Sequence, residues 1–117
     1  MRFVLRSKIH KAIVTDANID YVGSIGIDKN LIEKTGFIVG EKILVVSNTS
    51  GTRLKTYIIP EKADSGKISM YGAACKLIKK GEEIIIMGFE LSDKEINPQI
   101  ILVDKNNKFV KYLKDIE

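Results

Sequence analysis

Short apolar runs separated by turn residues occur along the whole sequence, and they constrain its fold more than any other feature. Residues 42–48 hold an apolar, β-branched run, the turn Asn48-Thr49-Ser50-Gly51 follows, and residues 52–59 return as a second strand that Pro60 ends. This order predicts a hairpin. Many short strands with scattered turns are typical of a small β-barrel. We therefore predict a mainly β protein with further strands at residues 2–14, 68–70, 83–90 and 99–104.

A few short helices and turns are expected between these strands. Asp28 can cap a helix over residues 29–34, which Gly36 closes. Residues 73–79 suit one or two helical turns, and residues 15–18 are typical of a turn.

The first predicted strand also predicts which side chains share a face. Strict alternation over residues 2–14 places Lys8 and His10 together. Residues 19–27 are expected to be extended but interrupted, because Gly26 loosens the strand at that point. The face opposite Lys8 is expected to carry Phe3, Leu5, Ile9 and Ile13.

Length, charge and cysteine content exclude several classes of protein. A chain of 117 residues can bury one core, so we predict a single domain over residues 1–117. The net charge of +4 is spread along the chain, whereas nucleic-acid surfaces concentrate basic residues in a stripe. No run reaches the ~18 apolar residues of a membrane helix, and the charged N-terminus is unlike a signal sequence. We expect a cytoplasmic protein with no nucleic-acid or membrane partner.

Metal chemistry is not expected either. The sequence contains one cysteine, Cys75, and one histidine, His10, so they cannot assemble a typical metal centre. A single cysteine also rules out an intrachain disulfide. The mild positive charge is compatible with a pocket for an acidic small molecule.

The dipeptide Gly23-Ser24 becomes informative through four other motifs that accompany it. Alone, Gly-Ser is a common loop dipeptide. Here it occurs with Ser-Lys-Ile-His at 7–10, Thr-Asp-Ala-Asn at 15–18, Arg-Leu-Lys-Thr-Tyr at 53–57 and Gly-Ala-Ala at 72–74. In this order and spacing, the set resembles the pyruvoyl-dependent aspartate decarboxylase family. The resemblance runs from about residue 1 to about residue 104.

This resemblance implies a fold, an activity and an assembly. The fold would be a six-stranded double-psi β-barrel, and the precursor would cut itself between Gly23 and Ser24 into residues 1–23 and 24–117. Ser24 would become a covalent pyruvoyl cofactor. The enzyme would remove the α-carboxylate of L-aspartate, giving β-alanine and CO2 for pantothenate and coenzyme A synthesis. It would be a homotetramer with sites at subunit interfaces, and a maturation factor could assist the cut.

The implied chemistry assigns roles to five residues. The Ser24 hydroxyl must be activated to attack the Gly23 carbonyl, and the resemblance places Thr56 in support of that step. The resulting ketone forms a Schiff base with the substrate amine and acts as an electron sink. Arg53 can hold a substrate carboxylate bidentately, and Lys8 is placed at the same site. Tyr57 lies four residues after Arg53, on the same strand face, and is the expected general acid.

Other candidate residues have both a functional and a structural interpretation. Tyr21 either helps to bind substrate or packs on the barrel. The backbone N–H groups of Gly72, Ala73 and Ala74 either receive a substrate carboxylate or serve close packing. His10 is either structural or close to the processing site. Tyr71 departs from the family pattern, which has asparagine there, and a phenol cannot supply both a donor and an acceptor.

Two alternative functions remain open from the sequence. A decarboxylase with the same mechanism could act on glutamate, which is one methylene longer than aspartate. A non-catalytic double-psi barrel could instead bind nucleic acid or protein. The combination of Ser24, Lys8, Arg53 and Tyr57 argues against the non-catalytic alternative, because such a protein would have no use for it.

Overall fold

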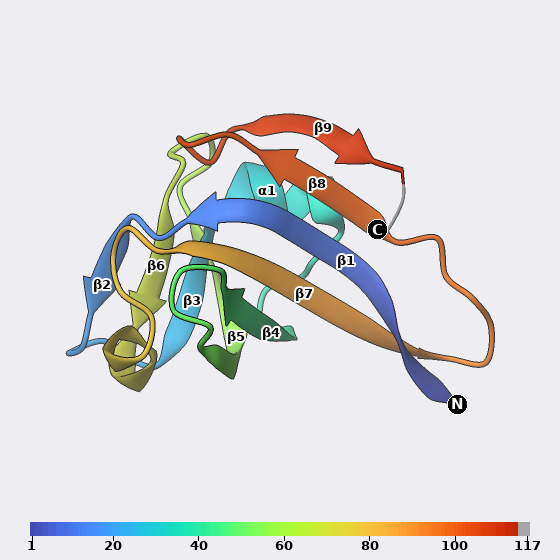
Figure 1. Ribbon diagram of the computed structural model, residues 1–117, viewed down its shortest axis with the longest axis horizontal. Helices are drawn as coiled ribbons and strands as arrows, with labels where there is room; N and C mark the ends of the chain where they lie inside the picture. The colour runs from blue at the N-terminus through green and yellow to red at the C-terminus, as the bar shows by residue number, and fades with distance from the viewer. Residues whose placement is uncertain (115–117) are drawn as a thin grey trace.

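The structure is mainly β, as the sequence predicts. The computed structural model describes residues 1–114, in which nine strands accompany one α-helix and one 3-10 helix (Figure 1). Within these residues, no helix is long and apolar enough to cross a membrane. The elements are β1 (Arg2–Ile13), β2 (Asp16–Asn18), β3 (Ser24–Asp28), α1 (Lys29–Thr35), β4 (Lys42–Ser47), β5 (Arg53–Glu61), β6 (Ile68–Tyr71), η1 (Gly72–Lys76), β7 (Glu83–Ser92), β8 (Gln99–Val103) and β9 (Phe109–Leu113).

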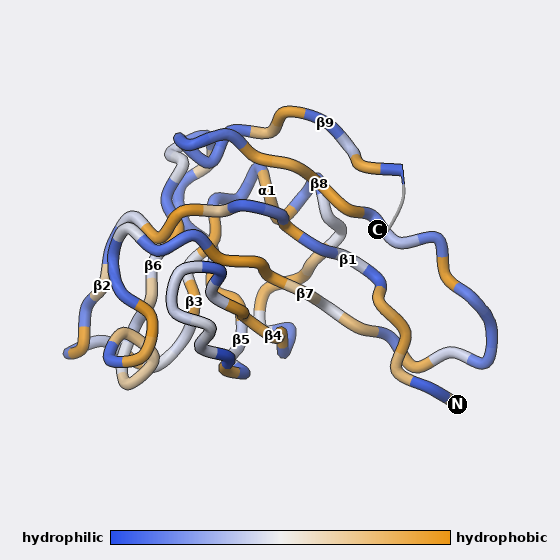
Figure 2. Tube along the Cα trace, in the orientation of Figure 1, coloured by the Kyte–Doolittle hydropathy of each residue, from blue (hydrophilic) through white to orange (hydrophobic). Residues whose placement is uncertain are grey.

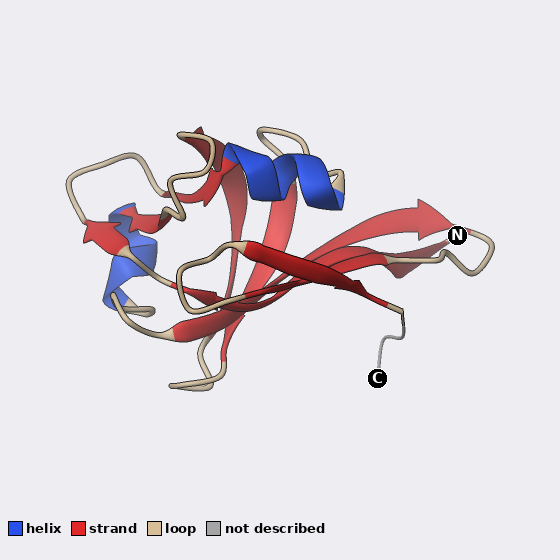
Figure 3. Ribbon diagram, turned by 90° about the horizontal axis from the view of Figure 1, so that it is seen from above, coloured by secondary structure: helices blue, strands red, loops and turns tan. Residues whose placement is uncertain are grey.

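The strands form one mixed sheet in the order β2-β6-β3-β5-β4-β7-β1-β8-β9. The predicted hairpin is confirmed as the antiparallel pair β4–β5. The antiparallel pair β1–β7 is the longest, and Figure 3 shows that it extends beyond the rest of the sheet at the N-terminal end. The sheet places β3, which begins at Ser24, between β5 and β6.

Isoleucine dominates the core. Apolar residues gather along β7 and β8 (Figure 2), and they pack against the inner faces of the neighbouring strands. Burying such side chains is the main source of folding free energy, at about 25 cal/mol for each Å² of apolar surface removed from water. The fully buried side chains include Ile9, Ile25, Ile27, Ile58, Met70, Ile84, Ile86 and Ile101.

The predicted alternation along β1 is wrong on both sides of residues 7–10, and Phe3, which was expected on the face of the buried Ile9, is 76% exposed. The ladder with β7 has irregularities between Leu5 and Ser7 and between Ile9 and Ala12, and the second coincides with Lys11 at φ 68°. A bulge adds one residue to a strand and so reverses the faces that follow. Ala12 is therefore buried, although Lys8 and His10 still share a face, as predicted, because residues 7–10 pair regularly with β8.

Residues 15–18 form a strand rather than the predicted turn. Asp16–Asn18 pair in parallel with Ser69–Tyr71 of β6. Thr15 prepares this pairing, because its backbone N–H donates to the Ile68 carbonyl at 2.8 Å and its hydroxyl accepts from the Ile68 N–H at 3.0 Å. The partner strand, distant in sequence, overrides the local turn signal.

Helix α1 follows its predicted signals closely. The Asp28 carboxylate accepts from the Asn30 N–H at 2.8 Å, and Gly36 closes the helix at φ 74°. Strand β5 is longer than predicted, since it continues through Pro60 to Glu61. Pro60 is exposed, and a proline is tolerated in a strand where its missing N–H is not needed.

Asn107 joins three parts of the chain, and its removal should destabilise the fold. This fully buried side chain accepts from the Ile13 N–H and donates to the carbonyls of Ile13 and Gly66, each at 2.8 Å. We expect Asn107→Ala to lower the free energy of unfolding by about 3 kcal/mol, because buried backbone groups would lose their partners. Urea denaturation measures the change. Asn106→Ala, which alters an exposed side chain in the same turn, should stay within about 0.5 kcal/mol of the parent. Equal effects of the two substitutions would contradict this interpretation.

Candidate active site

Ser24 opens strand β3 in a buried position. Its side chain is 1% exposed, whereas the two preceding residues, Val22 and Gly23, lie at the surface. The Ser24 hydroxyl donates to the Val22 carbonyl at 3.1 Å. The peptide bond between Gly23 and Ser24 therefore lies where an exposed loop enters the sheet.

Gly72 packs directly against Gly23. A Cβ atom added to Gly72 would lie 2.6 Å from the Gly23 Cα, and Gly72 adopts φ 68°, which favours glycine. Gly23 itself does not have a positive φ. Close backbone packing is thus the observed role of Gly72, and Ala73 and Ala74 continue from it in η1.

Among the predicted site residues on the neighbouring strand β5, Tyr57 lies beside Ser24. Ile25 pairs with Ile58 in the parallel pair β3–β5, so Tyr57 occupies the position beside Ser24. Side chains at paired positions point to the same face, and Tyr57 is partly exposed on the face opposite the core.

The same strand carries the other two candidates of its motif. Arg53 begins β5 and is exposed; the strand alternation puts it on the face of Tyr57, as predicted. Tyr57 lies four positions after Arg53, which corresponds to about 13 Å along a strand. Thr56 is half-buried and alternates to the opposite face, where its partner on β4 is the buried Ile43.

Tyr71 lies directly across from Ser24 in the antiparallel pair β3–β6. Its ring packs against that of Tyr21, with 4.6 Å between the ring centroids. Its hydroxyl donates to the Glu61 carboxylate at 2.5 Å. Burial, followed by this hydrogen bond, raises the pKa of Tyr71 above that of a free phenol. The aromatic pair holds the segment before Ser24 against β6.

Glu61 is a neighbour of this site that the sequence analysis missed. The prediction that Pro60 ends the strand excluded it. The sequence feature that could have identified Glu61 is its spacing: Arg53, Tyr57 and Glu61 follow one another at intervals of four, which puts all three on one face of β5.

The interpretation of Gly26 as a residue that loosens the strand is also wrong. Gly26 lies inside β3, and a Cβ there would lie 2.1 Å from a Glu61 carboxylate oxygen.

Lys8 and His10 lie on a strand that is not adjacent to β3 in the sheet order. Both lie on β1, and the sheet order places β5, β4 and β7 between β1 and β3. The four steps between strands amount to about 19 Å along the sheet. His10 has a buried Nδ1 without a hydrogen-bond partner, and burial together with Lys8 and Lys11 lowers its pKa.

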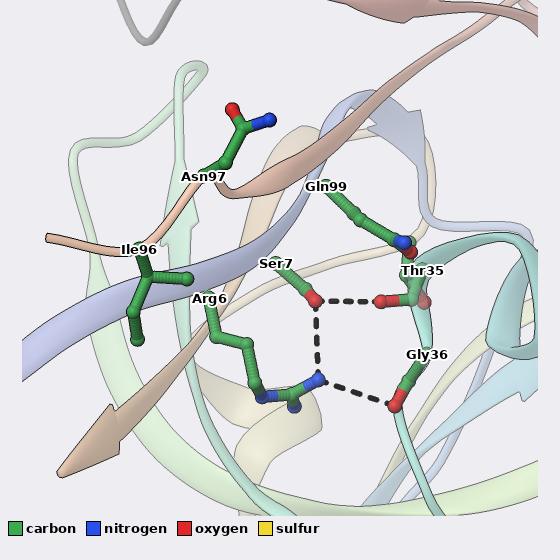
Figure 4. Close-up of a pocket in the computed structure, with 7 residues that line it drawn as sticks. All are labelled: Arg6, Ser7, Thr35, Gly36, Ile96, Asn97 and Gln99. Atoms are coloured by element: carbon green, nitrogen blue, oxygen red, sulfur yellow. Dashed lines mark hydrogen bonds between the residues drawn. The ribbon is translucent and has the colours of Figure 1, made fainter. Parts of the chain in front are cut away.

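A hollow of about 260 Å³ beside Arg6 contains none of the predicted residues (Figure 4). Arg6 donates to the Gly36 carbonyl at 3.1 Å and pairs with Glu41, while Ser7 donates to the Thr35 carbonyl at 2.6 Å. These contacts satisfy the Arg6 charge inside the fold. In the part of the chain that the structure describes, no three His, Cys, Asp or Glu side chains are grouped to hold a metal.

Comparison with known proteins decides between the interpretations. A family model described as aspartate decarboxylase matches residues 1–110. This chain belongs to the aspartate decarboxylase family. An aspartate 1-decarboxylase of Caldicellulosiruptor saccharolyticus is 46% identical over 112 residues, covering 92% of this chain and 88% of the relative. Another of Bacillus velezensis is 41% identical over 116 residues, covering 96% of this chain and 91% of the relative.

Membership of the aspartate decarboxylase family confirms the predicted enzyme class and cofactor. The family consists of carboxy-lyases that act on aspartate. Its members use a pyruvoyl group derived from a serine, and the chain carries Ser24 in the buried position described above. Family membership alone does not assign roles to the other side chains.

Proposed function

We propose that this chain cuts itself between Gly23 and Ser24 and then removes the α-carboxylate of L-aspartate, releasing β-alanine and CO2. The observation that carries the proposal is the position of Ser24 in a chain of this family. It is buried at the start of β3, directly after an exposed glycine, with Tyr57 and Tyr71 on the two flanking strands. A loop serine without a chemical role would not require such enclosure.

The cut follows from the chemistry of serine. Ser24 Oγ adds to the Gly23 carbonyl carbon, and the amide C–N bond breaks as the hydroxyl proton passes to the departing nitrogen, leaving an ester. Elimination removes the proton from Ser24 Cα as a base takes it up, breaks the Cβ–Oγ bond, releases Gly23 as a carboxylate and leaves dehydroalanine. Addition of one water and loss of one ammonia then give the ketone. We propose that Thr56, on the strand beside Ser24, supports the developing negative charge on the Gly23 oxygen.

The residues around Ser24 fit a pyruvoyl group. The side chain of Ser24 is almost completely shielded from water, and Gly72 allows the backbone to pack closely without a Cβ. The group, once formed, supplies an electron sink for the pair left by the departing carboxylate. Tyr57, beside Ser24, holds the proton that the α-carbon receives.

Two cations and one backbone segment are proposed to bind the substrate carboxylates. Arg53 is exposed on the same strand face as Tyr57 and can form a bidentate pair. Lys8 supplies the second charge from a neighbouring chain. The backbone N–H groups of Gly72, Ala73 and Ala74 begin beside Gly23 and complete the carboxylate contacts, while Tyr21 borders the site through its contact with Tyr71.

We also propose that the sheet closes into a six-stranded double-psi barrel and that residues 1–117 act as one domain. Support comes from the run that contains β1 and β2. Its first part pairs with β7 and β8 near one end of the sheet order, and its second part pairs with β6 near the other end. A sheet joined to itself by one run of chain has few free edges.

A homotetramer would unite the residues that one chain keeps apart. A groove of about 600 Å³ has a mainly apolar lining of Phe3, Ile43, Leu44 and Phe89, bordered by the charged residues Glu41, Lys42 and Lys55, and Phe3 is 76% exposed. Contiguous exposed apolar surface marks interaction sites. The position of Lys8 four strand steps from Ser24 in the sheet order is the second support, because in an assembly a neighbouring chain would bring Lys8 to the site.

The proposed function is tested by intact mass and product analysis of the purified protein. We expect two fragments, residues 1–23 and 24–117, with the larger one lighter by one ammonia than a peptide that begins with serine. The processed protein should release β-alanine and CO2 from L-aspartate and act more slowly on L-glutamate. A chain that stays uncut after long incubation and produces no β-alanine would contradict the proposal.

A further inference from the structure

The Glu61 carboxylate occupies an unusual position at the outer face of β3. Its side chain is 13% exposed and covers Gly26, two residues after Ser24. A Cβ at Gly26 would overlap the carboxylate, at 2.1 Å from Oε2 and 2.7 Å from Cδ. Lys67 Nζ is 3.9 Å from the other oxygen, which provides a partial counter-charge. The absence of a side chain at position 26 thus makes room for the carboxylate.

Tyr71 connects this carboxylate to the peptide that is proposed to break. Its hydroxyl donates to Glu61 at 2.5 Å, and its backbone is opposite Ser24 in the β3–β6 ladder. Its ring packs against Tyr21, and its carbonyl oxygen would lie 3.8 Å from a Cβ on Gly23. One residue therefore contacts the strand on which Ser24 lies, through its backbone, and the loop that leads to it, through its ring.

We infer that Tyr71, fixed by Glu61, is a positioning residue that holds the Gly23–Ser24 peptide in the geometry required for self-cleavage. The inference rests on the proposed function, because it concerns the rate of that cut. Its physical basis is orientation: a displacement of about 1 Å between a nucleophile and its target can slow a reaction by about 100-fold. The hydrogen bond to Glu61 restricts the rotation of Tyr71, and the ring restricts the loop.

Two further features support a positioning role for Tyr71 rather than a role as an acid or base. Its pKa is raised by burial and by Glu61, so the hydroxyl remains a donor throughout the neutral range. Ser69 Oγ is buried without a hydrogen-bond partner two residues before Tyr71. Ser69 lowers the pKa of Tyr71, but burial and the hydrogen bond to Glu61 outweigh this effect, so Glu61 is the partner that fixes the phenol.

The test compares the rate of self-cleavage in freshly purified Tyr71→Phe, Glu61→Ala and Glu61→Gln proteins with that of the parent. Intact mass follows the uncut fraction over time at a temperature where thermal melting shows every variant to be folded. Tyr71→Phe and Glu61→Ala should cleave at least about tenfold more slowly, since each removes the hydrogen bond. Glu61→Gln keeps an acceptor oxygen of the same shape and should cleave within about threefold of the parent.

A matched control separates the loss of this hydrogen bond from the loss of any phenol. Tyr112 lies on β9, and its hydroxyl donates to the Lys34 carbonyl at 2.9 Å. Tyr112→Phe removes this hydroxyl and should leave the cleavage rate unchanged. A second readout is turnover per processed subunit. For Tyr71→Phe it should stay within about twofold of the parent, because only the cut depends on the uncleaved peptide geometry.

The outcomes distinguish this inference from the function on which it rests. If the parent cuts normally and Tyr71→Phe cuts at the same rate, Tyr71 does not position the peptide. The same conclusion follows if Glu61→Gln is as slow as Glu61→Ala, or if turnover per processed subunit falls as far as the cleavage rate. A parent protein that never cuts would overturn the proposed function itself, and this inference with it.

Discussion

Ser24→Ala should give a folded, uncut and completely inactive protein. Alanine removes the only atom that can attack the Gly23 carbonyl, so neither the ester nor the ketone derived from it can form. The loss of stability should be small, because Ser24 Oγ makes a single hydrogen bond, to the Val22 carbonyl. One such bond contributes about 1 kcal/mol. Denaturing intact mass should show one species of 117 residues, and thermal melting should stay close to that of the parent before it cuts.

A control serine shows whether the effect is specific to the position. Ser65 is an exposed turn residue whose hydroxyl only accepts from the Lys67 N–H at 3.2 Å, and it is followed by a glycine. Ser65→Ala should cut and turn over aspartate like the parent. A Ser24→Ala protein that still produced β-alanine would overturn the mechanism, because no other residue has been assigned the electron sink. An unfolded Ser24→Ala protein would contradict the small stability cost.

Local signals predicted the elements whose hydrogen bonds are local. The hairpin β4–β5 depends on one turn, and helix α1 depends on the Asp28 cap and on Gly36 at its end. In each case the residues that decide the structure are close together in sequence. The same explains why Arg53 and Tyr57 could be assigned to one strand face from their spacing alone.

The errors occur where a partner distant in sequence decides the outcome. The bulge near Lys11 reverses the buried face of β1, so Ala12 points inward. Residues 16–18 form a strand only because β6 offers an edge that Thr15 engages. Gly26 looked like an interruption, yet its missing side chain accommodates Glu61, a residue 35 positions away in the sequence. Such features follow from pairing between segments, which a local pattern does not encode.

The candidate site shows the same division. Ser24 and Tyr57 are neighbours because β3 and β5 pair in parallel, and family motifs anticipated their association without showing the register. Glu61 carries no motif, so only the structure connects it to Tyr71. Lys8 belongs to the motif set and nevertheless lies four strand steps from Ser24. For Lys8, the family motif suggests a place at the site, and its position on a strand that is not adjacent to β3 is the reason for the proposal that a neighbouring chain supplies it.

A mixture of two inactive variants should therefore regain activity. Lys8→Ala chains keep Ser24 and are expected to cut themselves, because position 8 is not on a strand adjacent to β3. Ser24→Ala chains stay uncut but keep Lys8. If each site takes Ser24 from one subunit and Lys8 from its neighbour, an equal, randomly assembled mixture should contain about one quarter of the parental number of complete sites. Co-expression followed by a β-alanine assay measures this recovery, and intact mass verifies the ratio of the two chains.

A second mixture makes the result independent of how well the chains assemble. Parent chains combined equally with a Lys8→Ala/Ser24→Ala double variant should also give about one quarter of the parental activity if the site is shared, but about one half if each chain carries both residues. In that second case the two single variants would give no activity at all. The two arrangements thus predict different results: the two mixtures have equal activity if the site is shared, whereas the first has none and the second about one half if it is not. Recovery in the first mixture would place Lys8 at the partner's Ser24-derived group and explain why exposed apolar surface is retained on a chain that already has a complete core.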